Sequence, residues 1–222
     1  MEFTPQQISQ PEEQNSKREL TQEEKETLKS FENIPFIDLS DKLDFLWTWR
    51  KLKNGSEFEL NKDVTKEEEE SIIEIVKKSG LLIKVVDAVK PEDSKFKRKF
   101  FFIANNQEDL ELISKLYLGD HFKPEVYLEL GRIYGFPKTA IEAFDQTHNS
   151  SEGVKKDWDE FLLTSKEKME KTPKEVSSFV QFKLSREHWP AEIEVVKKWA
   201  EEIKLVDPDF YLKILNRGSG GS

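Results

Sequence analysis

The side chains of this chain best suited to hold a metal ion lie around His121. Asp120 precedes this histidine, and Glu125 follows it four residues later. Imidazole and carboxylate groups bind Zn²⁺, and a spacing of four residues puts two side chains on one face of a helix. Pro124 interrupts this geometry, because proline favours the first position of a new helix. An enzyme or metal-binding protein with a site near His121 and Glu125 is therefore an alternative and not the leading hypothesis.

Other sequence signatures of catalysis are missing. The chain contains no cysteine, which excludes disulfides, thiolate nucleophiles and cysteine-ligated metals. No GxSxG motif accompanies a serine. We predict no cofactor, and the missing motifs weigh against an enzyme without excluding one.

A basic run directly precedes three phenylalanines. Lys95, Lys97, Arg98 and Lys99 lead into the phenylalanines at positions 100–102. Cations that hold phosphates beside rings that stack on bases are typical of nucleic-acid surfaces. Side chains alternate between the two faces of a strand, so the three rings cannot share one surface, and we expect them in the core. This run is an alternative nucleic-acid site; otherwise its lysines protect the edge of a hairpin.

Three aromatic residues are candidates for binding a partner protein. Trp47 and Trp49 are two residues apart in a predicted helix, so they cannot face the same side, and one of them is expected at the surface. Tyr134 lies beside a predicted turn. Aromatic side chains often supply much of the binding energy of protein interfaces. We take Trp47, Trp49 and Tyr134 as candidate partner-binding residues.

The densest pattern of the chain is LGRIYGFPKTAIEAF, at residues 130–144. Gly135 tolerates the left-handed conformation that ends a helix, and Pro137 favours the start of the next one, so the segment predicts a sharp corner between two helices. Gly131 is the small residue that lets the second helix cross the first closely. The spacing over residues 127–144 therefore resembles that of DNA-binding helix-turn-helix units.

The second helix of this corner is poorly suited to read bases. Lys138, Thr139, Glu142 and Asp145 are expected on its exposed face and include no Arg, Asn or Gln for paired contacts to bases. Two of these four residues are acidic and would repel phosphates. DNA binding through Lys138 and Thr139 is thus the second hypothesis, behind a structural role for the corner.

The same segment resembles a family of uncharacterised prokaryotic proteins in which a GYP turn is followed by paired cysteines. Thr139 and Ala140 stand where that pair would fall. The family is also similar over residues 178–205, where KLSREHW replaces a Pro-Cys-Ser cluster and only Ser185 and the following helix remain. The resemblance implies kinship of fold. It carries no activity over, because the thiolates are missing.

Capping signals and hydrophobic periodicity predict a predominantly helical α+β fold. Capping boxes start helices at Thr21 and Thr65, and Ser40 is expected to cap a helix that closes near Asn54 and Gly55. Apolar and β-branched residues at 81–89 and 99–104 predict an antiparallel β-hairpin. We expect about seven or eight helices around this hairpin.

Composition divides the chain into four parts. Residues 1–20 are polar and are expected to form a disordered tail. Residues 21–148 are expected to form an α+β core, and residues 149–217 a C-terminal helical region that can pack with the core as one domain. Residues 218–222 read GSGGS, a flexible linker composition that we exclude from the fold.

The net charge and hydropathy favour a protein partner. There are 44 acidic and 35 basic residues, and the net charge of −9 disfavours nucleic acid. No apolar run approaches the ~20 residues of a membrane span, and the amino terminus lacks an apolar signal segment, so we expect a cytoplasmic protein that does not bind membranes. The leading hypothesis is a soluble, non-enzymatic binding or interaction protein with a protein partner.

Overall fold

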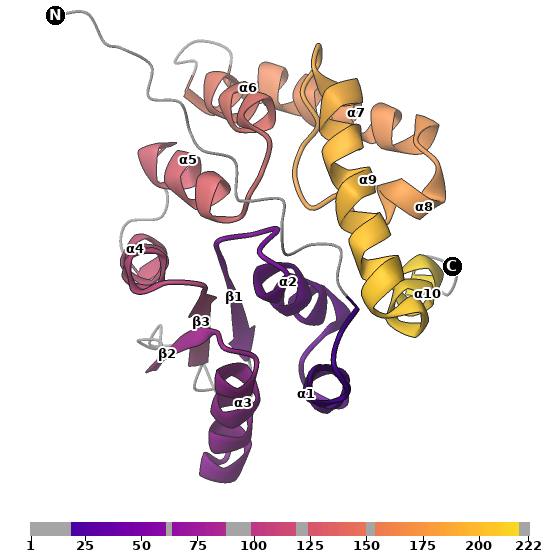
Figure 1. The fold of residues 1–222 in the computed structure, drawn as a ribbon. Coiled ribbons are helices and arrows are strands. Elements are labelled where there is room, and N and C mark those ends of the chain that lie inside the picture. Colours follow the sequence, from indigo (N-terminus) through magenta and orange to yellow (C-terminus); the bar gives the residue numbers. More distant parts are fainter. Residues whose placement is uncertain (1–18, 61–63, 88–98, 119–123, 150–153, 218–222) are drawn as a thin grey trace, which may run out of the picture.

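The computed structural model describes residues 19–60, 64–87, 99–118, 124–149 and 154–217, without the side chains of residues 124–125, 147–149 and 154–159. Within these residues a three-stranded sheet is combined with ten helices, so the fold is predominantly helical α+β, as expected (Figure 1). The elements are α1 (Gln22–Glu32), α2 (Leu39–Trp49), β1 (Gly55–Leu60), α3 (Lys66–Lys78), β2 (Leu82–Asp87), β3 (Lys99–Ala104), α4 (Gln107–Leu118), α5 (Pro124–Ile133), α6 (Lys138–Asn149), α7 (Val154–Lys171), α8 (Lys174–Ser177), α9 (Trp189–Val206) and α10 (Pro208–Asn216).

Side-chain caps define where the first helices begin. Thr21 and Thr65 form the expected capping boxes at α1 and α3. The expected cap of α2 was wrong: Asp38, and not Ser40, accepts hydrogen bonds from the amides of Ser40 and Asp41. A carboxylate also interacts favourably with the positive end of the helix dipole, which explains this choice.

The expected hairpin is part of a larger antiparallel sheet. β2 pairs with β3, and β3 also pairs with β1, so the strand order is β1-β3-β2. β1 begins at Gly55, where we expected α2 to close, because α2 already ends at Trp49. Ser56, Phe58 and Leu60 are buried at every second position of β1, which is the alternation of a half-buried strand. β1 and β2 are therefore the two edge strands among the described residues.

The sheet separates two apolar clusters. Phe101 and Ile103 belong to the larger cluster with side chains of α1, α2 and α3, whereas Phe102 and Ala104 belong to the smaller one with side chains of α4 and α5. Phe100 is half-buried against the smaller cluster. The expectation of a core position is confirmed for Phe101 and Phe102, whereas Phe100 lies at the margin. The alternation of β3 explains the division of the rings between two faces.

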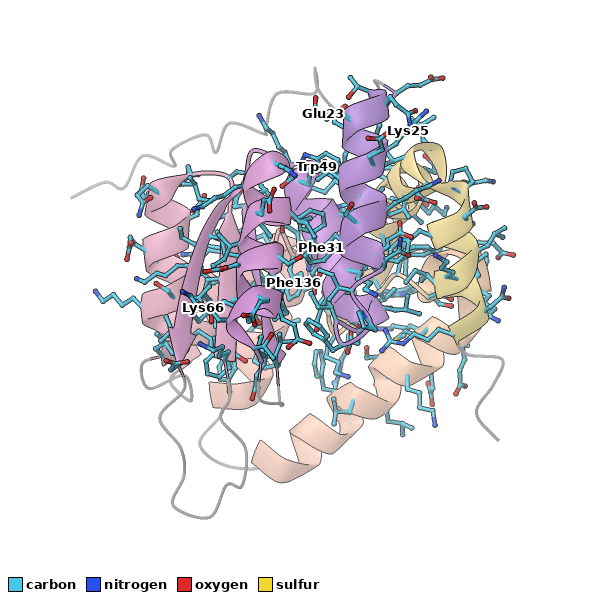
Figure 2. All side chains as sticks on the ribbon, turned by 90° about the horizontal axis from the view of Figure 1, so that it is seen from below. Glu23, Lys25, Phe31, Trp49, Lys66 and Phe136 are labelled. Atoms are coloured by element: carbon cyan, nitrogen blue, oxygen red, sulfur yellow. The ribbon has the colours of Figure 1, made fainter. Side chains whose placement is uncertain are left out.

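The larger cluster reaches from α1 to the C-terminal helices. The rings of Phe31 and Phe45 stack with their centroids 3.9 Å apart, and Trp47 contacts Trp199 of α9 at 4.9 Å. Figure 2 shows Phe31 pointing into the interior, while Lys25 on the same helix points outward. Among the described helices, none is long and apolar enough to cross a membrane.

The last helix was not expected from the sequence. Pro208 was taken as the end of the preceding helix, but it occupies the first turn of α10. Asp207 caps this helix by accepting a hydrogen bond from the amide of Phe210 at 2.8 Å. Proline lacks only an amide that has no partner within the first turn, so it can begin a helix as readily as end one.

The corner between α5 and α6 has the expected geometry. Gly135 adopts a φ of 69°, and the amide of Phe136 donates to the carbonyl of Gly131 at 2.9 Å, as in a Schellman motif. A Cβ atom on Gly131 would lie 3.0 Å from Cγ1 of Ile141 on α6, so the small residue sits where the two helices cross. A Cβ atom on Gly135 would lie 2.6 Å from the carbonyl oxygen of Leu52, so the corner is also pressed against the turn that follows α2.

Replacing Gly135 with Ala is expected to destabilise the protein more than replacing Gly80 with Ala. Both glycines have positive φ, 69° and 79°, and an alanine in this region costs about 1–2 kcal/mol. A Cβ atom on Gly80 meets nothing within 4 Å, whereas one on Gly135 collides with the backbone of Leu52. We expect Gly135→Ala to lose about 1–3 kcal/mol more in urea-induced unfolding. Equal losses would contradict the close contact.

Candidate functional site

A buried lysine side chain lies between α2, the α5–α6 corner and the segment around Gln181. Lys53 belongs to the turn between α2 and β1, and its side chain is 3% exposed. Its ammonium forms an ion pair with Asp44 of α2 and donates a hydrogen bond to the side-chain oxygen of Gln181 at 2.5 Å. Moving an ammonium from water into a protein costs several kcal/mol unless it is paired, so these partners must stay in place.

Three aromatic rings complete the surroundings of this ammonium. The Nζ atom of Lys53 lies 5.0 Å from the ring centroid of Trp47, 5.6 Å from that of Phe136 and 5.7 Å from that of Tyr134. A cation within about 6 Å of an aromatic face is attracted by the ring, more strongly when water is excluded. We call these residues, with Glu57, the Lys53 cluster: Asp44, Trp47, Lys53, Glu57, Tyr134, Phe136 and Gln181.

Backbone hydrogen bonds fix the turn that carries Lys53. The amide of Asn54 donates to the carbonyl of Ile133 at 2.9 Å, which joins the turn to the end of α5. The side-chain amide of Asn105 donates to the carbonyls of Thr48 at 2.9 Å and of Lys53 at 3.0 Å. The position of the ammonium is thus set by α2, the α5–α6 corner and the segment between β3 and α4 together.

A second buried ion pair joins the same turn to α9. Arg50 and Glu202 have side chains that are 6% and 8% exposed, with 2.6 Å between Nη2 and Oε1. The Nε atom of Arg50 donates to the same oxygen, also at 2.6 Å. Charge-assisted hydrogen bonds of this kind specify geometry strongly.

Glu57 and Tyr134 form a titratable pair within the cluster. Burial and, to a smaller extent, the charge of Asp44 raise the pKa of Glu57 from 4.5 to about 7, against the opposing effects of the Tyr134 hydrogen bond and of Lys53. Burial and the neighbouring Glu57 raise the pKa of Tyr134 well above 10. Tyr134 therefore keeps its proton and donates to Glu57, while Glu57 changes charge near neutral pH.

Thr139 and Ser185, which are far apart in the sequence, meet at another buried carboxylate. Glu192 of α9 is 1% exposed and accepts hydrogen bonds from the hydroxyl of Thr139 at 2.7 Å and the amide of Ser185 at 2.8 Å. Lys168 of α7 donates to the carbonyl of Ser185 at 2.5 Å. Thr139, which we expected on the exposed face of the second helix, is thereby turned towards the interior.

The three aromatic residues selected from the sequence have different positions. Trp47 is fully buried, with its indole nitrogen lacking a hydrogen-bond partner among the described residues, so it is a core residue in this structure. Trp49 is half-buried, 6.0 Å from the ring of Phe45. Tyr134 is half-buried beside Lys53. Trp47 and Tyr134 therefore lie together around the ammonium of Lys53, whereas Trp49 lies outside the Lys53 cluster.

The candidate basic residues within the described part of the chain form ion pairs with carboxylates. Lys99 pairs with Glu69 at 2.9 Å and with Asp87 at 2.7 Å. Lys138 pairs with Glu142 at 3.5 Å. Lys95, Lys97 and Arg98 lie outside the described residues.

The candidate metal site near His121 cannot be placed. His121 lies outside the described residues, and the side chain of Glu125 is not described. Within the described part of the chain, no group of three or more His, Cys, Asp or Glu side chains could hold a metal ion.

A groove beside β2 was not anticipated from the sequence. All six residues of β2 keep some solvent exposure, whereas four of six are buried in β1 and in β3. Leu82, the first residue of β2, is 37% exposed. A groove of about 380 Å³ opens beside this strand between α3 and α4, lined by Lys77, Leu81, Leu82, Ile83, Lys84, Gln107, Leu110 and Glu111.

Comparison of this chain with protein-family models, with curated proteins and with solved structures finds no match. Function is therefore argued from the geometry of the chain itself.

Removing the ammonium of Lys53 is expected to destabilise the protein strongly. Lys53→Met keeps most of the volume of the aliphatic stem and leaves the partly buried carboxylate of Asp44 without its partner. We expect a loss of about 3 kcal/mol in the free energy of unfolding, measured with urea. Lys66→Met is the matched control, because the side chain of Lys66 is 83% exposed and its pair with Glu70 is long, at 3.5 Å. A loss at Lys53 no larger than that of the control would contradict this role.

Stability is expected to fall as the pH rises through neutrality. A carboxyl group whose pKa is raised by folding stabilises the fold fully below its unfolded pKa, near 4.5, and loses this contribution as the pH passes the folded value, about 7 for Glu57. Burial also raises the pKa of Glu32 and of Asp41 to about 7. The free energy of unfolding should therefore decrease between about pH 5 and pH 8.

Glu57→Gln tests the share of this effect that belongs to the Lys53 cluster. The variant should show a shallower decrease over the same pH range, because one of the titrating groups is gone. Glu74→Gln is the control: Lys78 lowers the pKa of Glu74, so its titration lies below this range and the slope should not change. A Glu57→Gln variant with the slope of the original protein would refute the assignment.

Proposed function

We propose that this chain is a non-enzymatic interaction protein, and that a partner protein binds in the groove beside β2. The observation that carries the proposal is the exposed edge of the sheet at β2, which is continuous with an apolar groove that opens to solvent. Exposed apolar surface bordered by polar residues is typical of protein-binding sites.

The two edges of the sheet differ in how they are covered. β1 lies against the α5–α6 corner: Tyr134 hydrogen-bonds to Glu57, and a Cβ atom on Gly55 would lie 3.2 Å from Cγ2 of Ile133. β2 lies at the opposite edge of the sheet, as Figure 1 shows. Among the described elements, no strand pairs with its outer side.

The lysine on β2 does not prevent another chain from pairing with this edge. Natural edge strands often carry lysines that discourage pairing with another chain. Lys84 is instead held against α4, where its ammonium pairs with Glu111 at 2.6 Å and donates to the hydroxyl of Ser114 at 3.0 Å. The edge is therefore left accessible to a partner.

The Lys53 cluster supports this proposal as part of the framework. Its ammonium is enclosed and engaged by Asp44 and Gln181, so it positions the corner against β1. A rigid framework reduces the conformational entropy that is lost when a partner binds.

DNA binding through the corner stays a prediction from the sequence. Of the two residues expected to face DNA, Thr139 binds Glu192 and Lys138 pairs with Glu142. Both contacts are to carboxylates, which disfavours the binding of phosphates by the corner.

Site-specific photo-cross-linking tests the proposed interaction. A photoreactive amino acid at position 82 of the full chain should cross-link to a discrete protein in the cells that make this chain. Leu163 on α7 is the control position, because it is 58% exposed and lies outside the groove. Cross-links of the same pattern from both positions, or none from position 82, would contradict the proposal.

A further inference from the structure

No strand of the described residues pairs with the outer side of β2. In an antiparallel sheet the amides and carbonyls of alternate residues point towards opposite neighbours, so an edge strand leaves half of them free. β2 has six residues and pairs only with β3 among the described strands. Backbone polar groups gain hydrogen bonds when another extended chain lies beside them.

The charges at the two ends of β2 are opposite. Lys77, in the last turn of α3, lines the groove next to the start of β2 and is exposed, and no carboxylate of the described residues pairs with it. Asp87 is the last residue of β2 and is 76% exposed. A segment laid along β2 therefore meets the positive charge of Lys77 at the Leu82 end, whereas Asp87 at the other end already pairs with Lys99 at 2.7 Å.

From these observations we infer that the partner binds as an extended segment of its chain, added as an antiparallel strand to the outer edge of β2. This inference rests on the function proposed above and specifies the partner's chemistry. An added strand that runs antiparallel to β2 has its carboxyl end beside Leu82, close to Lys77. The partner segment therefore carries an acidic residue near its carboxyl end, which pairs with Lys77. A segment of about six residues, some 20 Å long, covers β2.

The groove defines which side chains the segment carries. Every second side chain of an added strand points to the face of the sheet that α4 covers. Leu82 and Leu110 supply apolar walls on that side, with Gln107 and Glu111 at the margin. The segment therefore alternates apolar residues, which enter the groove, with polar residues on the other face.

Selection from a displayed library of random dodecapeptides on the full chain tests this inference. We expect enriched sequences to alternate apolar and polar residues and to carry Asp or Glu towards the carboxyl end. Binding of the enriched peptides should weaken by about tenfold or more in Leu82→Lys and in Lys77→Glu. Leu163→Lys and Lys166→Glu make the same chemical changes on exposed positions of α7 and should leave binding unchanged.

Amide hydrogen exchange of the complex supplies the backbone readout. The amides of β2 that do not pair with β3 should become protected when an enriched peptide binds, and circular dichroism verifies that each variant is folded. Peptides that bind without protecting these amides, or without sensitivity to Lys77→Glu, would overturn strand addition. If position 82 still gives its specific cross-link in that case, the proposed interaction stands and only this inference fails; loss of both refutes both.

Discussion

The ammonium of Lys53, buried among carboxylate, amide and aromatic groups, is the interaction on which the arrangement of this protein depends. A charge 97% removed from solvent must be matched by nearby partners, and here they come from α2, from the α5–α6 corner and from the segment around Gln181. These parts are far apart in the sequence. Keeping them within reach of one nitrogen atom fixes the turn after α2, and the Arg50–Glu202 pair ties that turn to α9.

This constraint also determines which edge of the sheet is accessible. Because the corner is held over the turn at Lys53, Tyr134 reaches Glu57 and Ile133 lies against Gly55, so the corner packs against β1, one edge strand of the sheet. The edge at β2 lies on the opposite side of β3 and receives no such cover from the described elements. The buried charged residues and the proposed binding surface are therefore linked. The buried charges fix how the helices pack around the sheet, and this packing leaves β2 at an accessible edge.

The features that the sequence reveals are those determined by neighbouring residues. The capping boxes at Thr21 and Thr65, the positive φ of Gly135 and the close helix crossing at Gly131 follow from local chemistry, and all are present. The Lys53 cluster could not be predicted, since its members converge only through the tertiary fold and a lysine gives no sequence signal of burial. Strand β1 was not predicted, because it follows shortly after a helix, although its apolar and polar residues alternate as in a strand. α10 was missed because proline begins a helix as well as ending one.

Native-state hydrogen exchange at Asn54 tests most directly whether Lys53 holds the corner in place. The amide of Asn54 donates to the carbonyl of Ile133, so it reports on the contact between the turn and the corner. The account predicts that Asn54 exchanges as slowly as the amides of β3 in the original protein. In Lys53→Met it should exchange at least about tenfold faster relative to those of β3, which corresponds to a local loss of about 1.4 kcal/mol. If the exchange rate of the Asn54 amide relative to the β3 amides were the same in both proteins, this role of Lys53 would be contradicted.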